Sequence, residues 1–366
     1  MNVLFVFPRR GLFQLTRCND CGHVFKCENC SSKLTAYKSE SISYKLQLLC
    51  HQCQTSYIYP NSCPTCSSKD VLSRYGGIDD LVGKLQTLAK TSHEVYHTNT
   101  LFYRLDKGDE FLVDTPDQKS DLGLNVGLDI QIQERTERKE IVSSHLISQL
   151  FFDEDISDLH IGFVTRLFDP SVDYSLFDRI IFVQAENLLA APDWLVTEDV
   201  YKSIFEIIHQ IKQTSTGAVI TFDTNSPNLP LFTDLIQLNS HNENVISPEI
   251  WYTTFLEKEL KNREKFSYPP YNNLILLTTQ SKTETISRES LGEVTRYLST
   301  LAPQMPEISW SSAYPAKFLK RKGLFSHHLV IRYPRQYTKF FQLRNEITKL
   351  TDLYRIQVRL NPRHLF

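Results

Sequence analysis

Cys18-Asn19-Asp20-Cys21 and Cys27-Glu28-Asn29-Cys30 open a stretch of the chain that closes with Cys50-His51-Gln52-Cys53 and Cys63-Pro64-Thr65-Cys66. These four Cys-x-x-Cys pairs contain all eight cysteines of the 366-residue chain. Two such pairs supply the four thiolates of one tetrahedral zinc site, so the stretch predicts two structural Zn²⁺ ions. A disulfide framework would need an oxidising compartment, and a redox Cys-x-x-Cys normally occurs once, so both alternatives are disfavoured.

The spacing does not decide which pairs share an ion, because sequential and nested pairing both satisfy it. The inner pairs, separated by the 19 residues between Cys30 and Cys50, are typical of a zinc ribbon. If that ribbon closes on itself, Cys18, Cys21, Cys63 and Cys66 form a second site at its base. With eight thiolates available, His23 and His51 are interpreted as bystanders. Both sites would be closed and structural.

Length and composition are typical of a globular protein of two or three domains, since 41% of its 366 residues are hydrophobic. The formal net charge is −2, but it is unevenly distributed. Residues 106–160 carry a balance of −9 and residues 310–366 one of +10, which indicates a C-terminal end that faces a polyanion. Reduced cysteines, no long apolar run and no leader sequence predict a cytoplasmic protein without a membrane partner.

Hydrophobic periodicity before residue 248 predicts a parallel sheet covered by helices on both faces, hence an α/β domain. Val3–Phe7 is expected to be a buried strand that ends in the turn Pro8-Arg9-Arg10-Gly11. Leu81, Leu85 and Leu88 mark a helix. The other predicted strands are 94–96, 110–113, 128–132, 160–164, 179–183 and 218–222, and the other predicted helices are 141–152 and 201–211.

A helix around Trp251, Phe255 and Leu260 is expected to act as a bridge, because Pro269-Pro270 cannot continue it. Beyond the two prolines the pattern is strand 274–279, helix 284–301, strands 308–312 and 328–333, helix 338–349 and strand 354–360. That βαββαβ order predicts an α+β ferredoxin-like C-terminal domain.

The most basic loop of the chain lies between the two middle strands of this predicted domain. It contains Lys317, Lys320, Arg321 and Lys322, interleaved with Phe318, Leu319 and Phe325. Such cations displace counterions from phosphates, and aromatic side chains stack on unpaired bases, so the loop is a candidate DNA contact. A solvated hairpin tip whose aromatic residues belong to the core is the competing interpretation.

Nucleotide-binding and catalytic motifs are absent from the 366 residues. No glycine lies in a G-x-x-x-x-G-K-[ST] arrangement, so no phosphate-binding loop is predicted. Asp153-Glu154-Asp155 resembles a metal-binding acidic motif but is interpreted as a solvated helix end. Asp109-Glu110 is likewise not interpreted as a metal-binding motif. No Ser/His/Asp or Cys/His set is spaced for nucleophilic catalysis. No catalytic residue is therefore predicted.

Taken together, these motifs resemble the replication-restart DNA helicases of the primosomal protein N′ family, from their second helicase lobe onward. That family carries an eight-cysteine module directly after a strand ending in an Arg-Arg-Gly-type turn, as Arg9-Arg10-Gly11 does here. Further matches are Arg263 with Tyr268-Pro269-Pro270-Tyr271, Pro315-Ala316 with Lys320-Arg321-Lys322-Gly323, and Asn361-Pro362. The resemblance implies nested ligand sets: Cys18, Cys21, Cys63 and Cys66 for one zinc, and Cys27, Cys30, Cys50 and Cys53 for the other.

The resemblance also implies a domain order. It comprises a degenerate RecA-like lobe (1–17 and 67–247), a zinc module (18–66), a bridging helix (248–268) and a DNA-binding domain (269–366). The family's Gly-Arg-Ala-Gly-Arg motif, whose arginines reach the nucleotide phosphates, corresponds here to residues 209–216, with no arginine or glycine. Its Gly-Thr-Gln-Met segment corresponds to Gly162-Phe163-Val164-Thr165, and its acidic pair to Gln184-Ala185-Glu186.

These departures predict a zinc-containing protein of DNA replication restart and primosome assembly that binds forked or single-stranded DNA without ATPase activity of its own. The family's first lobe and N-terminal DNA-binding domains have no counterpart before Met1. Other primosome or single-strand-binding proteins, or a separate first helicase lobe, are expected as partners. Two alternatives compete: the second-lobe subunit of a two-chain ATP-dependent 3′–5′ helicase, and a zinc-ribbon scaffold that binds only proteins.

Overall fold

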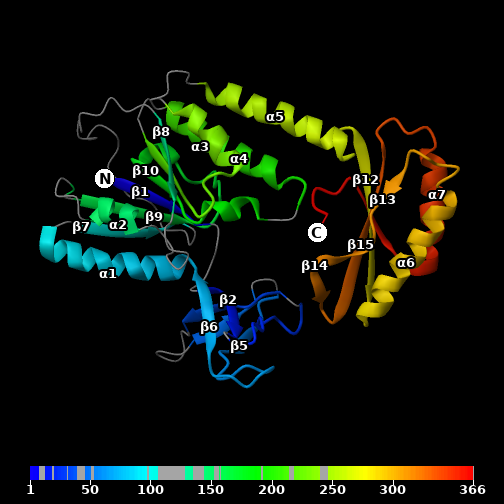
Figure 1. Cartoon of the computed structure of the whole chain (residues 1–366), viewed down its shortest axis with the longest axis horizontal. Helices are drawn as coiled ribbons and strands as arrows, with labels where there is room; N and C mark the ends of the chain where they lie inside the picture. The colour runs from blue at the N-terminus through cyan, green and yellow to red at the C-terminus, as the bar shows by residue number, and fades with distance from the viewer. Residues whose placement is uncertain are drawn as a thin grey trace.

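The computed structural model describes most of the chain and arranges it around three β-sheets (Figure 1). The described residues are 1–7, 13–18, 20–30, 32–38, 46–50, 53–96, 99–105, 128–134, 144–151, 156, 158–190, 193–213, 218–239 and 246–365. The predicted turn at residues 8–11, the predicted strand at 110–113, Asp109-Glu110, Asp153-Glu154-Asp155 and His51 lie outside these ranges. Among the residues that the structure describes, no helix is both long and apolar enough to cross a membrane.

The first sheet is parallel throughout and has six strands in the order β7-β9-β1-β10-β11-β8. Its strands are β1 (Asn2–Val6), β7 (Asn99–Arg104), β8 (Asp129–Glu134), β9 (Asp158–Val164), β10 (Arg179–Phe182) and β11 (Val219–Thr224). The N-terminal strand is therefore central, and its residues 3–6 are fully buried because parallel strands are covered on both faces.

Helices cover both faces of this sheet, as the periodicity predicts (Figure 1). One face holds α1 (Ile78–Tyr96) and α2 (Ser144–Phe151), and the other holds α3 (Val196–Gln213), α4 (Pro230–Leu235) and α5 (Pro248–Lys265). Short 3₁₀ turns are η3 (Tyr174–Leu176), η4 (Ala185–Leu189) and η5 (Ile236–Leu238). The side chains of β1 alternate between the two faces of the sheet. Leu4 and Val6 pack with α3 to α5, while Val3 and Phe5 pack with α1 and α2. The predicted α/β class is confirmed.

The second sheet carries the cysteines and is inserted between β1 and α1. It is antiparallel, with five strands in the order β5-β4-β3-β2-β6. The strands are β2 (Phe13–Cys18), β3 (Thr35–Lys38), β4 (Leu46–Leu49), β5 (Ser56–Ile58) and β6 (Val71–Gly76). Because β2 and β6 pair with each other, the insert leaves and re-enters the α/β body through adjacent strands.

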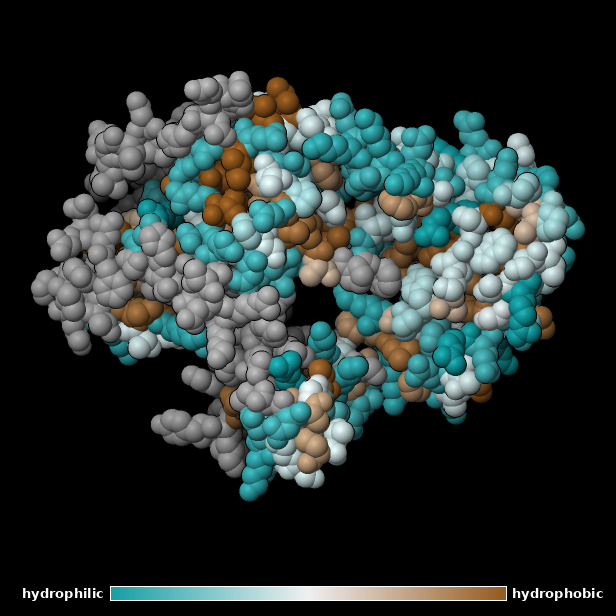
Figure 2. All heavy atoms as spheres, viewed as in Figure 1, coloured by the Kyte–Doolittle hydropathy of each residue, from teal (hydrophilic) through white to brown (hydrophobic). Residues whose placement is uncertain are grey.

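The third sheet is also antiparallel, and two helices pack on one of its faces. It contains β12 (Asn272–Ser281), β13 (Ser309–Trp310), β14 (Tyr314–Arg321), β15 (Leu324–Pro334) and β16 (Gln357–Leu360), with α6 (Glu284–Leu301) and α7 (Phe340–Tyr354). The order is β13-β15-β12-β16, with β14 also paired to β15. Helix α5 leads to this sheet (Figure 1). Figure 2 shows a largely hydrophilic surface over α5.

Four local expectations differ from the structure. Residues 94–96 were predicted as a strand but form the last turn of α1, because no proline interrupts the helix and each added residue contributes a hydrogen bond. Only Ser309 and Trp310 of the predicted strand 308–312 form β13, and the basic stretch interpreted as a loop is largely strand β14. Helix α7 runs further than predicted and ends at Tyr354, and Arg355 follows it with a φ of 52°.

Candidate metal sites and a candidate nucleic-acid interface

The four Cys-x-x-Cys pairs share one backbone hydrogen bond. In each pair the N–H of the first cysteine donates to the carbonyl oxygen of the residue five positions later, at 2.8–2.9 Å. The four donor–acceptor pairs are Cys18 and His23, Cys27 and Ser32, Cys50 and Thr55, and Cys63 and Ser68. This turn folds the chain back within one pair, so that both thiols point to the same side.

A residue with positive φ closes the turn in the three pairs where that position is described. It follows the first cysteine by four positions and is Gly22 (φ 73°), Gln54 (φ 60°) or Ser67 (φ 59°). The N–H of each donates back to the carbonyl oxygen of the first cysteine of its pair. Only Gly22 is a residue type that adopts this left-handed region without strain. The turn is therefore imposed on Gln54 and Ser67 by their surroundings.

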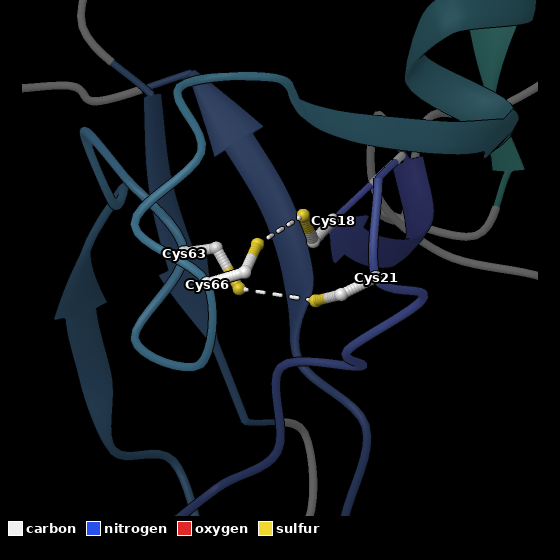
Figure 3. Close-up of side chains that lie close together, drawn as sticks. All are labelled: Cys18, Cys21, Cys63 and Cys66. Atoms are coloured by element: carbon white, nitrogen blue, oxygen red, sulfur yellow. Dashed lines mark hydrogen bonds between the residues drawn. The ribbon is translucent and has the colours of Figure 1, made fainter.

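The structure brings the eight sulfurs together as two separate clusters. Cys18, Cys21, Cys63 and Cys66 form the outer cluster, shown in Figure 3, and Cys27, Cys30, Cys50 and Cys53 form the inner cluster. Within each cluster all four sulfurs lie within 4.8 Å of one another. This is the nested arrangement that the resemblance implied, and it excludes sequential pairing.

Sulfur–sulfur distances fit a tetrahedral ion. Cys18 and Cys66 are 3.5 Å apart at Sγ, and Cys21 and Cys63 are 3.6 Å apart. In the inner cluster the Cys27–Cys53 and Cys30–Cys50 distances are 3.4 and 3.2 Å. A zinc ion with bonds of about 2.3 Å to four sulfurs sets neighbouring sulfurs about 3.8 Å apart. Each cluster could hold one metal ion with a closed shell of four thiolates.

Groups around the inner cluster favour the thiolate form. The hydroxyl and the backbone N–H of Thr55 lower the pKa of Cys53 to about 6, since both donate hydrogen bonds to its sulfur. The hydroxyl of Tyr57 lies 3.2 Å from Cys27 Sγ. Such partners orient metal ligands and adjust their affinity for the ion. Sequence reasoning missed Thr55 and Tyr57, although a hydroxyl residue two positions after Cys53 was a usable signal.

His23 is not part of either cluster. Its Nδ1 lies 2.9 Å from the Thr65 hydroxyl oxygen, so it joins the first Cys-x-x-Cys turn to the fourth. It also contacts Phe25 edge-on, with ring centroids 5.2 Å apart. The interpretation of His23 as a bystander is consistent with this position.

The predicted DNA-contact residues lie on one hairpin, formed by β14 and β15. Lys320 pairs with Phe325 and Arg321 with Leu324, and the turn is Lys322-Gly323, where both residues have positive φ. Lys317, Arg321 and Lys322 are exposed, whereas Lys320 and Phe325 are half-buried. Between Pro315 and Lys320 the strand bulges, since residues 316–319 face only Ser326. Lys317 therefore projects from a bulge rather than from the regular ladder.

The positions that the resemblance aligned with helicase nucleotide motifs are engaged in packing and local hydrogen bonds in the structure. A Cβ on Gly162 would lie 3.2–3.3 Å from the side chains of Leu4, Leu105 and Phe177. Gln184 is buried, with a φ of 53°, and its carbonyl oxygen accepts from Asn187. Glu186 accepts from the backbone N–H of Asn225 at 3.3 Å.

The fold and these sites define an α/β protein with an inserted pair of four-cysteine clusters, each able to hold a metal ion, and a basic hairpin on a separate antiparallel sheet. Sequence comparison confirms the resemblance predicted from the motifs: the chain is similar to replication restart protein PriA of diverse bacteria. No protein-family model matches the chain.

Three of these relatives illustrate the extent of the match. PriA of Thermotoga maritima is 23% identical over 335 residues, which cover 90% of this chain and 36% of that protein. PriA of Borreliella burgdorferi is 24% identical over 79% of this chain and 35% of its own length. PriA of Synechocystis sp. is 24% identical over 91% and 33%. The chain thus spans about a third of the length of these curated relatives.

Proposed function

We propose that this chain is a zinc-containing DNA-binding protein that acts in replication restart and primosome assembly at forked or single-stranded DNA. The observation that carries the proposal is the pair of nested four-cysteine clusters, in a chain similar to PriA proteins over about nine tenths of its length. In this proposal each cluster binds one Zn²⁺ ion. DNA, other primosome proteins and single-strand-binding proteins are its partners, and it works in the cytoplasm.

The proposed domain division follows the three sheets. Residues 1–17 and 67–247 form a degenerate RecA-like lobe, 18–66 the zinc module, 248–268 a bridging helix and 269–366 a ferredoxin-like domain. The strand order β16-β12-β15-β13 supports the last assignment, because it places the fourth, first, third and second strands of a βαββαβ unit in that sequence. Strand β14 is an addition to that pattern.

DNA binding is assigned to the basic hairpin. The predicted contact residues come from two paired strands and their turn: Lys317, Lys320, Arg321, Lys322 and Phe325. The charges of the four cations therefore act on one stretch of the ligand. Cations at a protein surface gain affinity for nucleic acid by releasing condensed counterions, and this gives a strong dependence on salt.

ATP hydrolysis by this chain alone is not expected. Residues 209–213 form the end of α3 and offer no arginine, and Gly162 and Gln184 are committed to packing and local hydrogen bonds. Phosphoryl transfer depends on cations and backbone groups that surround the phosphates. In this proposal the chain keeps the fold of a helicase lobe but does not hydrolyse ATP.

The test is fork binding by the purified chain, measured by fluorescence anisotropy at several salt concentrations. A triple charge reversal (Lys320→Glu, Arg321→Glu, Lys322→Glu) is expected to weaken binding at least tenfold and to flatten the salt dependence. Arg344→Glu, an exposed change on α7, is the matched control and leaves affinity within about twofold. Binding that is absent or insensitive to salt would overturn DNA binding, and DNA-stimulated ATP hydrolysis by the isolated chain would overturn the absence of a motor.

A further inference from the structure

Three strands of the third sheet end at the same edge. Ser281, the last residue of β12, pairs with Phe325 of β15, and Phe325 pairs on its other side with Lys320 of β14. One step further, Leu324 pairs with Arg321. Lys282 follows Ser281 directly, so continuing the register of β12 by one residue places Lys282 beside Leu324, on the side opposite Arg321. A lysine far earlier in the chain than the basic hairpin thus reaches the same edge of the sheet.

The cations at this edge are available to a ligand. Lys282, Lys317, Arg321 and Lys322 are exposed. None of them forms an ion pair with any residue that the structure describes. Lys282 and Arg321 are two strand spacings apart, a separation of about 10 Å across β15. The edge therefore presents a row of cations rather than a single charged tip.

The two aromatic residues of the hairpin are poorly placed to stack on bases. Phe318 and Phe325 are half-buried. The ammonium of Lys317 lies 5.9 Å from the Phe318 ring centroid, and that of Lys320 lies 5.4 Å from the Phe325 ring centroid. Each ring therefore already holds a cation over one face, at a distance where the attraction is significant. A base would have to displace a lysine to stack on that face.

We propose that this edge is a binding platform for the sugar–phosphate backbone of DNA, that Lys282 belongs to it, and that Phe318 and Phe325 support lysines instead of stacking on bases. The proposal rests on the proposed DNA binding and specifies which part of the DNA is contacted. It replaces the expectation that Phe325 stacks on unpaired bases. The platform joins the residue that follows β12, residues of β14 and the turn after β14 through the register of β15.

The test uses the whole chain and a labelled forked DNA, titrated at several salt concentrations. Lys282→Ala is expected to weaken binding several-fold and to lower the slope of log affinity against log salt by about one, the change that follows loss of one phosphate contact. Lys261→Ala on α5, also exposed, is the matched control and leaves slope and affinity unchanged. Phe325→Leu is expected to leave both within about twofold.

A second measurement does not depend on the folding of any variant. The unchanged chain is expected to bind a fork with abasic single-stranded arms as tightly as the same fork with its bases. Loss of more than about fivefold affinity on the abasic fork, or with Phe325→Leu at unchanged thermal stability, would show base stacking and overturn the platform while the proposed DNA binding stands. Unchanged affinity with Lys282→Ala would remove Lys282 from it. Failure of the unchanged chain to bind any fork would overturn both proposals.

Discussion

The hydroxyl oxygen of Tyr57 lies 3.2 Å from the sulfur of Cys27 and accepts a hydrogen bond from the backbone N–H of Glu28 at 3.1 Å. Burial and the neighbouring Cys27 raise the pKa of Tyr57 to about 12, so its hydroxyl keeps its proton at neutral pH. With the acceptor position filled by Glu28, the proton of the hydroxyl is directed to the sulfur. Tyr57 therefore acts as a hydrogen-bond donor to the Cys27 sulfur.

Tyr57→Phe removes this donor while keeping the ring. The zinc affinity of the inner cluster is expected to fall about tenfold or more, since partners of metal ligands typically contribute 10- to 100-fold. Competition with a chromophoric chelator measures this affinity. In the Tyr57→Phe variant, one of the two bound zinc ions should pass to the chelator at a lower chelator concentration than in the unchanged chain. Tyr59→Phe is the control, because the Tyr59 hydroxyl donates to the Val71 carbonyl oxygen. Identical transfer curves for the two variants would exclude a role for Tyr57 at the sulfur.

The nested clusters predict how zinc content responds to paired substitutions. Cys18→Ser with Cys66→Ser damages only the outer cluster and should leave one zinc per chain, whereas Cys18→Ser with Cys27→Ser damages both and should leave none. Metal analysis of the purified variants, together with the unchanged chain at two zincs, checks this. One zinc in both double variants would contradict the observed grouping.

Left-handed backbone at Ser67 predicts that glycine is favoured there. Ser67→Gly should strengthen zinc retention by the outer cluster by about 0.5–1 kcal/mol, because the φ of 59° strains a residue with a Cβ. Gly22→Ala should weaken it by about 1 kcal/mol. No atom lies within 4 Å of the position that a Cβ on Gly22 would take, so the loss would come from the backbone alone. Chelator titration measures both, and equal retention by the two variants would refute the expectation.

Regular periodic features were predictable from the sequence, whereas features set by tertiary register were not. The Cys-x-x-Cys spacing predicted two four-thiolate sites, and the buried runs predicted strands β1, β9, β10 and β11. Both depend on local patterns. Lys282 could not be assigned to the basic edge, because its place follows from the pairing of β12 with β15. The grouping of the cysteines likewise depended on the family resemblance, since local spacing permits either pairing.

The basic stretch shows a different limit. Consecutive charged residues suggested a loop, yet β14 extends through Lys320 and Arg321 because β15 offers a partner edge. Tertiary pairing overrides local preference in strands. Residues 94–96 show the reverse case, in which helix continuation overrides a short run with β-forming residues.

Arg263 lies near the end of α5, the helix that leads to the third sheet, and joins α5 to α3. It pairs with Glu198 and with Glu259, the latter at 3.0 Å, and its side chain is only 11% exposed. Its guanidinium lies 4.8 Å from the Trp194 ring centroid, and Trp194 stacks on Tyr268 with centroids 5.4 Å apart. Arg263 thus anchors a contact between segments far apart in the sequence.

Arg263→Ala is expected to reduce the free energy of unfolding by about 3 kcal/mol, because it leaves two partly buried carboxylates without their cation. Arg263→Lys should recover less than half, since an ammonium cannot serve both carboxylates and the ring. Urea unfolding followed by tryptophan fluorescence measures the loss. Lys258→Ala is the control: its pair with Asp234 is long, at 3.6 Å, and 61% exposed, so a change below about 0.5 kcal/mol is expected. Similar losses in both variants would show that the ion pairs of Arg263 add nothing.

His328 makes the stability of the third sheet depend on pH. Its side chain is buried beside the Thr278 hydroxyl at 2.9 Å, and burial, aided by the charge of Arg359, lowers its pKa from 6.5 to about 4. Between pH 6.5 and about pH 4, His328 is protonated in the unfolded chain but neutral in the folded chain. The free energy of unfolding therefore falls as the pH drops through this window, and above it His328 has no effect. The loss from this group amounts to about 3 kcal/mol at most. His328→Gln should remove this part of the pH dependence in urea unfolding at pH 4 to 7, whereas Thr278→Val should lower stability by about 1 kcal/mol and keep the slope. Parallel profiles for His328→Gln and the unchanged chain would show that His328 does not titrate as inferred.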